Sequence, residues 1–70
     1  MNHTIAVEQA WLEYRKKLLA FIRARVETSE DAEDILNDVF SKLLKLASEN
    51  NYPGNPAPWL YHVTKNRIVD

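Results

Sequence analysis

The chain has 70 residues, no cysteine, one glycine, three prolines and a net charge of −1. A chain this short forms one small domain, and without cysteine neither a disulfide nor a thiolate-bound zinc ion can stabilise it. A β fold would need several tight turns, but the only glycine, Gly54, lies among the three prolines in a single segment. We therefore predict an all-α fold, a small bundle of three helices held together by apolar packing.

The first helix is predicted over residues 4–26. Apolar residues recur along it at helical spacing and define one stripe, which Leu12, Leu19 and Val26 widen. We expect this stripe to face the core. Its central members are Trp11, Tyr14, Leu18, Phe21 and Ile22.

The second helix is predicted over residues 30–48. Thr28 and Ser29 are good N-cap residues, and Glu30 and Asp31 place carboxylates in the first turn, where the helix dipole favours them. The apolar positions then follow the helical period without a break, so this helix is also expected to contribute to the core. They are Ala32, Ile35, Leu36, Val39, Phe40, Leu43, Leu44 and Ala47.

The third helix is predicted over residues 56–70, after a loop at residues 49–55. Pro53 and Gly54 form a turn dipeptide, and Asn55 followed by Pro56 is typical of an N-cap and a first helical residue. No stop signal precedes the end at Asp70, so we expect residues 1–70 to be one domain of a longer protein. The thin core also predicts that such a fragment self-associates.

The charges are segregated along the chain. Residues 1–26 carry +3, residues 27–49 carry −5 and residues 50–70 carry +1. In the acidic segment, an amide, a hydroxyl and two carboxylates share one helix face, because they are three, four and seven positions apart. These residues are Asp34, Asn37, Asp38 and Ser41. The face suits a basic helical partner, although a solvated surface explains the same spacing.

The residues argue against an enzyme. The carboxylates lie on one convex helix face rather than across a cleft, and His62 has no acidic residue three or four positions away. No glycine-rich phosphate loop is present, and no serine has a base at suggestive spacing. The chain also lacks a secretion signal and an apolar run of about 18 residues. We expect a cytoplasmic binding domain without a metal or cofactor.

The segment from Tyr52 to Arg67 is the most informative part of the chain. Aromatic side chains that can stack on bases alternate there with amide and basic groups that can contact base edges. This composition is typical of a surface that binds single-stranded nucleic acid. The candidate contacts are Tyr52, Asn55, Trp59, His62, Lys65 and Asn66. For Trp59, core packing of a short helix is the alternative interpretation.

Three motifs follow one another in the chain: AEDILNDVF at residues 32–40, WLY at residues 59–61 and NRIVD at residues 66–70. In order and spacing they resemble region 2 of bacterial RNA polymerase sigma factors of the sigma-70 family, especially the extracytoplasmic-function type. The stretch WLEY at residues 11–14 lies where that family has its first helix, so the resemblance covers nearly the whole chain. The chain departs from the family pattern at Asn37, where glutamine is usual, at Pro58, and in lacking basic residues after Asp70.

The resemblance implies a function for each surface. It places Asp34, Asn37, Asp38 and the neighbouring Ser41 on the helix that docks on the clamp helices of the largest subunit of core RNA polymerase. It places the loop at residues 50–58 where the family captures a flipped-out base of the promoter −10 element. The third helix then reads the opened strand, and the polymerase supplies most of the attraction for phosphate.

Two other functions and one further partner stay open. The chain could be an acidic helical protein-interaction module without DNA binding, or a stand-alone helix-turn-helix repressor. Against the repressor, the link at residues 49–55 exceeds the usual turn of three or four residues, and a net charge of −1 does not suit a self-sufficient DNA binder. The resemblance also leaves room for an anti-sigma factor, which the residues do not identify.

Overall fold

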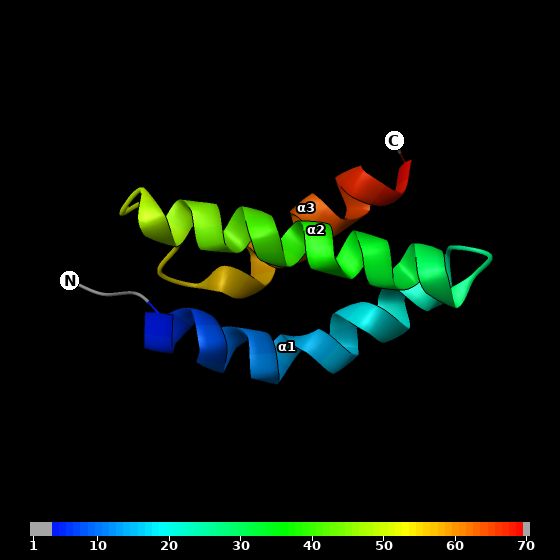
Figure 1. Ribbon diagram of the computed structural model, residues 1–70, viewed down its shortest axis with the longest axis horizontal. Helices are drawn as coiled ribbons and strands as arrows, with labels where there is room; N and C mark the ends of the chain where they lie inside the picture. Colours follow the sequence, from blue (N-terminus) through cyan, green and yellow to red (C-terminus); the bar gives the residue numbers. More distant parts are fainter. Residues whose placement is uncertain (1–3, 70) are drawn as a thin grey trace.

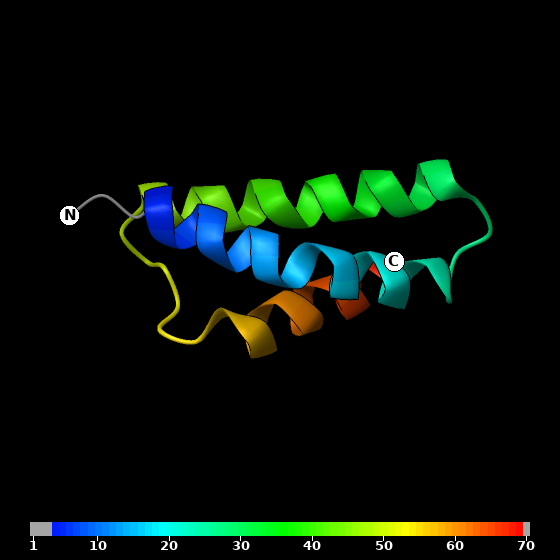
Figure 2. The ribbon, with the colours of Figure 1, turned by 90° about the horizontal axis from the view of Figure 1, so that it is seen from below.

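The computed structural model describes residues 4–69, which form the helices α1 (Thr4–Arg23), α2 (Ser29–Ser48) and α3 (Pro56–Val69). The first two helices lie side by side and run in opposite directions, and α3 packs against both of them on one side of the pair (Figures 1 and 2). The predicted all-α bundle of three helices is confirmed. The predicted helix end at Asp70 lies outside the described residues.

The core is one apolar cluster to which all three helices contribute. Its buried members, each no more than 6% exposed, are Val7, Leu18, Ile22, Ala32, Ile35, Leu36, Val39, Leu43 and Leu60. The rings of Trp11 and Phe40 stack at a centroid distance of 4.5 Å and extend this contact between α1 and α2. The buried Thr64 hydroxyl donates to the carbonyl of Leu60 at 2.7 Å, so α3 carries a polar residue into the core with its hydrogen bond made.

Two residues that were predicted to belong to the apolar stripes, Leu12 in the first helix and Leu44 in the second, lie in solvent. Leu12 is 78% exposed and Leu44 is 44% exposed. Leu12 follows Val7 by five residues and precedes Leu18 by six, which places it on the far side of α1 from the core. Val7 and Ala10 are buried instead, so the contact of α1 with the bundle begins earlier in the chain than the predicted stripe.

The first helix is shorter than predicted, because it ends at Arg23 rather than at Val26. The N–H groups of Arg25 and Val26 both donate to the carbonyl of Ile22, at 2.9 and 3.0 Å, which tightens the chain into a turn. The backbone of Thr28 is then extended, and its hydroxyl accepts from the N–H of Asp31 at 3.0 Å. The predicted N-cap at Thr28 is confirmed, and the chain must reverse before it, which is why α1 cannot run to residue 26.

The end of α2 uses an asparagine in the left-handed conformation. Asn50 has φ 59°, its N–H donates to Ala47 at 3.2 Å, and the N–H of Asn51 donates to Leu46 at 2.8 Å. These two bonds satisfy carbonyls that a helix end would leave without partners. The reversal after α2 therefore takes place at Asn50, whereas Gly54 has no positive φ.

The loop between α2 and α3 is held at both of its ends. The hydroxyl of Tyr52 donates to the carbonyl of Ala6 in α1 at 3.2 Å, and burial raises the pKa of Tyr52. The side chain of Asn55 accepts from the N–H of Ala57 at 3.4 Å, which confirms the predicted N-cap with Pro56 as first helical residue. Within residues 4–69, no helix is long and apolar enough to cross a membrane.

The core cluster predicts unequal costs for two identical substitutions in α1. Leu18→Ala should lower the free energy of unfolding by about 2–5 kcal/mol, because it leaves a cavity at a position that is 0% exposed. Leu12→Ala is the matched control and should change it by no more than about 0.5 kcal/mol. Urea denaturation followed by circular dichroism measures both values. Equal losses would contradict the assignment of Leu12 to the solvent face.

The left-handed residue at the end of α2 predicts a second contrast. Asn50→Ala should lower the free energy of unfolding by about 1 kcal/mol, because alanine tolerates a positive φ less well than asparagine. Gly54→Ala should leave it unchanged or raise it by about 0.4–1 kcal/mol, since no atom lies within 4 Å of the added Cβ. Thermal unfolding of the two variants tests this. If Gly54→Ala lowered the free energy of unfolding more than Asn50→Ala, the conformation of the loop would depend on the glycine rather than on Asn50.

Candidate functional site

The acidic face, which comprises Asp34, Asn37, Asp38 and Ser41, lies on the outer side of α2. Asp34, Asn37 and Ser41 are exposed, and Asp38 is half-buried. The helix is continuous from Ser29 to Ser48, so the predicted spacing of three, four and seven positions does place these four residues on one face. The prediction that these four residues share one helix face is confirmed.

Asp38 is already engaged within the domain. One of its carboxylate oxygens lies 3.1 Å from the Lys42 ammonium, one turn along α2, and 3.3 Å from the Arg67 Nε in α3. Both cations are about half exposed, so these ion pairs contribute little to stability. Their effect is positional, because the Arg67 contact joins the acidic face to α3. Sequence reasoning missed this contact, since 29 positions separate the two residues.

A hollow of about 190 Å³ extends the acidic face toward the turn between α1 and α2. It is lined by Val26, Asp31, Asp34, Ile35, Arg67 and Ile68. Sequence reasoning placed Asp31 only in the first turn of the helix. Its spacing, three positions before Asp34 and seven before Asp38, is a signal that would have added it to the acidic face. Asp31 thus adds a third carboxylate beside the acidic face.

The polar ridge, which comprises His62, Lys65 and Asn66, lies on the exposed side of α3. The Asn66 amide nitrogen and the His62 Nε2 are 3.2 Å apart, so the two side chains orient each other across one turn. The Lys65 ammonium makes no ion pair within residues 4–69. Three of the six predicted nucleic-acid contacts thus form a group of amide, imidazole and ammonium on one rigid helix.

The other three predicted contacts have structural roles. Tyr52 is half-buried and bonded to Ala6, and the Asn55 side chain caps α3. Trp59 is half-buried and packs against the core cluster, as the alternative interpretation of this residue expects. Their contact with nucleic acid stays a prediction. Among the described residues, no group of three or more histidine, aspartate or glutamate side chains could hold a metal ion.

The acidic face and the polar ridge belong to adjacent helices. They lie on α2 and α3, which pack against each other (Figure 1). The ion pair between Asp38 and Arg67 joins the two helices. The domain therefore presents an anionic surface on α2 and a group of amide, imidazole and ammonium on the adjacent α3.

Comparison with known proteins identifies the family of the chain. Neither the curated proteins nor the solved structures compared with the chain give a match. The family model described as Sigma-70 region 2 matches residues 10–70, which include most of α1, all of the described α2 and α3 and every residue of both surfaces. The chain therefore belongs to the sigma-70 region 2 family, the sigma-factor domains of transcription initiation that bind RNA polymerase and promoter DNA.

Proposed function

We propose that this domain binds core RNA polymerase through the acidic face of α2 and recognises and helps melt the promoter −10 element through α3 and its preceding loop. The observation that carries the proposal is the juxtaposition of two chemically different surfaces on adjacent helices. One surface suits a basic protein partner, and the other suits unpaired bases. In this role the domain acts with the polymerase in the cytoplasm and carries out no chemistry itself.

Polymerase binding is assigned to the exposed groups of the acidic face. The Asp34 carboxylate makes no ion pair within residues 4–69, and the Asn37 amide is exposed one turn away. Both groups are free to contact the clamp helices of the largest subunit. Charge complementarity at such an interface sets the orientation of the partner and raises the association rate. An anti-sigma factor or a second copy of the chain is a further proposed occupant of the same face.

Strand recognition is assigned to the polar ridge. An asparagine amide both donates and accepts hydrogen bonds, so Asn66 can contact the edge of an unpaired base. Flipping a base out of the duplex costs a few kcal/mol, and stacking on a protein side chain returns about 1–3 kcal/mol per base. With a net charge of −1, the domain attracts phosphate only weakly. The polymerase is therefore expected to supply most of that attraction.

Charge reversal at Asp34 tests the docking surface. Asp34→Lys should weaken binding to core RNA polymerase about tenfold or more, because it turns an attractive contact with a basic partner into a repulsive one. Glu13→Lys, an equal charge change at an exposed residue of α1, is the matched control and should bind normally. Biolayer interferometry on immobilised core polymerase measures both. Equal affinities for the two variants would remove the acidic face from the proposal.

Removal of the Asn66 amide tests strand recognition. In the complex with core polymerase, Asn66→Ala should reduce the preference for a −10 oligonucleotide over a scrambled one by about 1–3 kcal/mol, with a smaller loss of total binding. Gln9→Ala removes an exposed amide from α1 and should leave the preference intact. Competition binding with fluorescent single strands gives the ratio. If the unmodified domain binds core polymerase but the complex has equal affinity for the −10 and the scrambled oligonucleotide, the domain is an acidic interaction module.

A further inference from the structure

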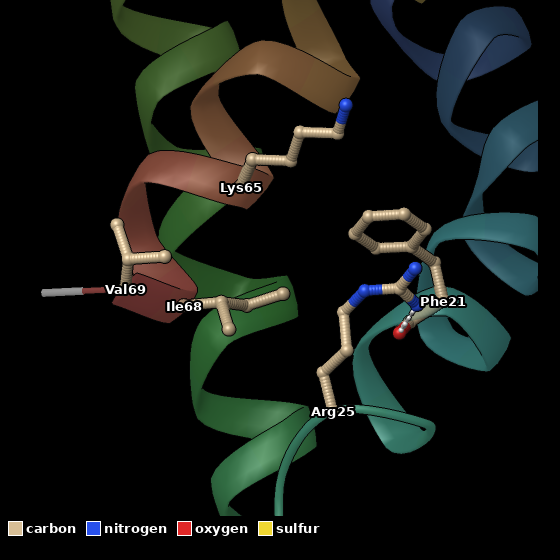
Figure 3. Close-up of a pocket in the computed structure, with 5 residues that line it drawn as sticks. All are labelled: Phe21, Arg25, Lys65, Ile68 and Val69. Atoms are coloured by element: carbon tan, nitrogen blue, oxygen red, sulfur yellow. Dashed lines mark hydrogen bonds between the residues drawn. The ribbon is translucent and has the colours of Figure 1, made fainter.

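A pocket of about 230 Å³ lies between the C-terminal end of α1 and the C-terminal half of α3 (Figure 3). It is lined by Phe21, Arg25, Lys65, Ile68 and Val69. Side chains from two helices and from the turn after α1 meet there. Of these five residues, only Lys65 belongs to the polar ridge. The helix α1 has no part in the proposed function.

The guanidinium of the arginine in this pocket lies over an aromatic ring. The Arg25 guanidinium carbon lies 3.6 Å from the centroid of the Phe21 ring, and Nη1 donates to the Phe21 carbonyl at 2.9 Å (Figure 3). Tyr61 of α3 contacts the same ring edge to face, at a centroid distance of 5.6 Å. The guanidinium plane is therefore positioned before any ligand arrives, and it keeps further N–H donors for one.

The charge of the pocket is not neutralised by the domain. Within residues 4–69, neither Arg25 nor Lys65 forms an ion pair, and no carboxylate lines the pocket. The carboxylates of α2 border the separate hollow that contains Arg67. Two cations beside apolar side chains fit a ligand that is flat and carries a negative charge. A nucleotide meets both requirements, because its base can stack on a guanidinium and its phosphate can contact an ammonium.

We propose that this pocket holds one nucleotide of single-stranded DNA, with the base against Arg25 and Ile68 and a phosphate near Lys65. The inference rests on the proposed function, because Lys65 directly precedes Asn66 on α3 and the bound strand must pass beside it. It extends the strand-binding surface from α3 across to α1. A strand that contacts the polar ridge would then insert one base into the pocket beside Phe21.

Nuclear magnetic resonance of the ¹⁵N-labelled 70-residue chain tests the pocket with three probes. They are the oligonucleotide (dT)8, an abasic octamer of equal charge and an octaglutamate peptide. With (dT)8, the amide signals of residues 21, 25, 65 and 68 should shift, and the abasic strand should bind more weakly. Arg25→Ala should weaken (dT)8 binding about five- to tenfold, the loss expected from part of one stacked base.

Two further variants separate stacking from charge. Arg25→Lys keeps the charge but not the planar group, so it should bind (dT)8 and the abasic strand nearly equally. Arg23→Ala, an equal charge change at an exposed arginine of the same helix end, is the matched control and should keep the preference for bases. Circular dichroism of each variant confirms that the helices are intact.

Each remaining outcome overturns the inference in a recognisable way. The amide shifts could be confined to residues 55–66, and Arg25→Ala and Arg23→Ala could have equal affinity for (dT)8. This result would exclude the pocket as a binding site and leave the proposed function unaffected. Equal shifts with octaglutamate would assign the pocket to an acidic protein partner. If (dT)8 shifts no signal, the inference fails together with strand binding by this chain, while the polymerase assay on Asp34→Lys still reports on docking.

Discussion

The apolar contact between α1 and α2 is the interaction on which the rest of the domain depends. Leu18 and Ile22 of α1 and Leu36 and Leu43 of α2 are all less than 2% exposed, and they account for much of the core. The short α3 adds the buried Leu60 to this cluster, and Trp59, Tyr61, Val63 and Ile68 of the same helix pack against it. If the two long helices did not pack together, α3 would have nothing to bind, and neither proposed surface would keep its position.

The faces of α2 and α3 that the core does not cover are the ones available for partners. Asp34 and Asn37 lie on the solvent side of a helix whose other side is buried, so packing holds their backbone without using their side chains. His62 and Asn66 likewise lie on the solvent side of α3, whose other side is buried at Leu60. Building both surfaces on helices positions polar groups more accurately than a loop could, because helix geometry sets their spacing.

Local features of this fold could be predicted from the sequence, and features that depend on a neighbouring helix could not. The caps at Thr28 and Asn55 involve residues two or three positions apart, so the local sequence alone was enough to predict them. The exposure of Leu12 depends on which side of α1 the other helices cover, and periodicity does not define the edges of that side. In the same way, the acidic face follows from spacing within α2, whereas the pocket at Phe21 exists only because α3 packs beside α1.

The hydrogen bond from Tyr52 to Ala6 makes the loop between α2 and α3 depend on the far end of the chain. It spans 46 positions of sequence and joins the loop to the first turns of α1. Fraying of α1 at its start would release the phenol and, with it, the backbone that leads into α3. The first turns of α1 thus help to set the shape of a loop that lies within the segment matched by the family model, although Ala6 itself lies outside that segment.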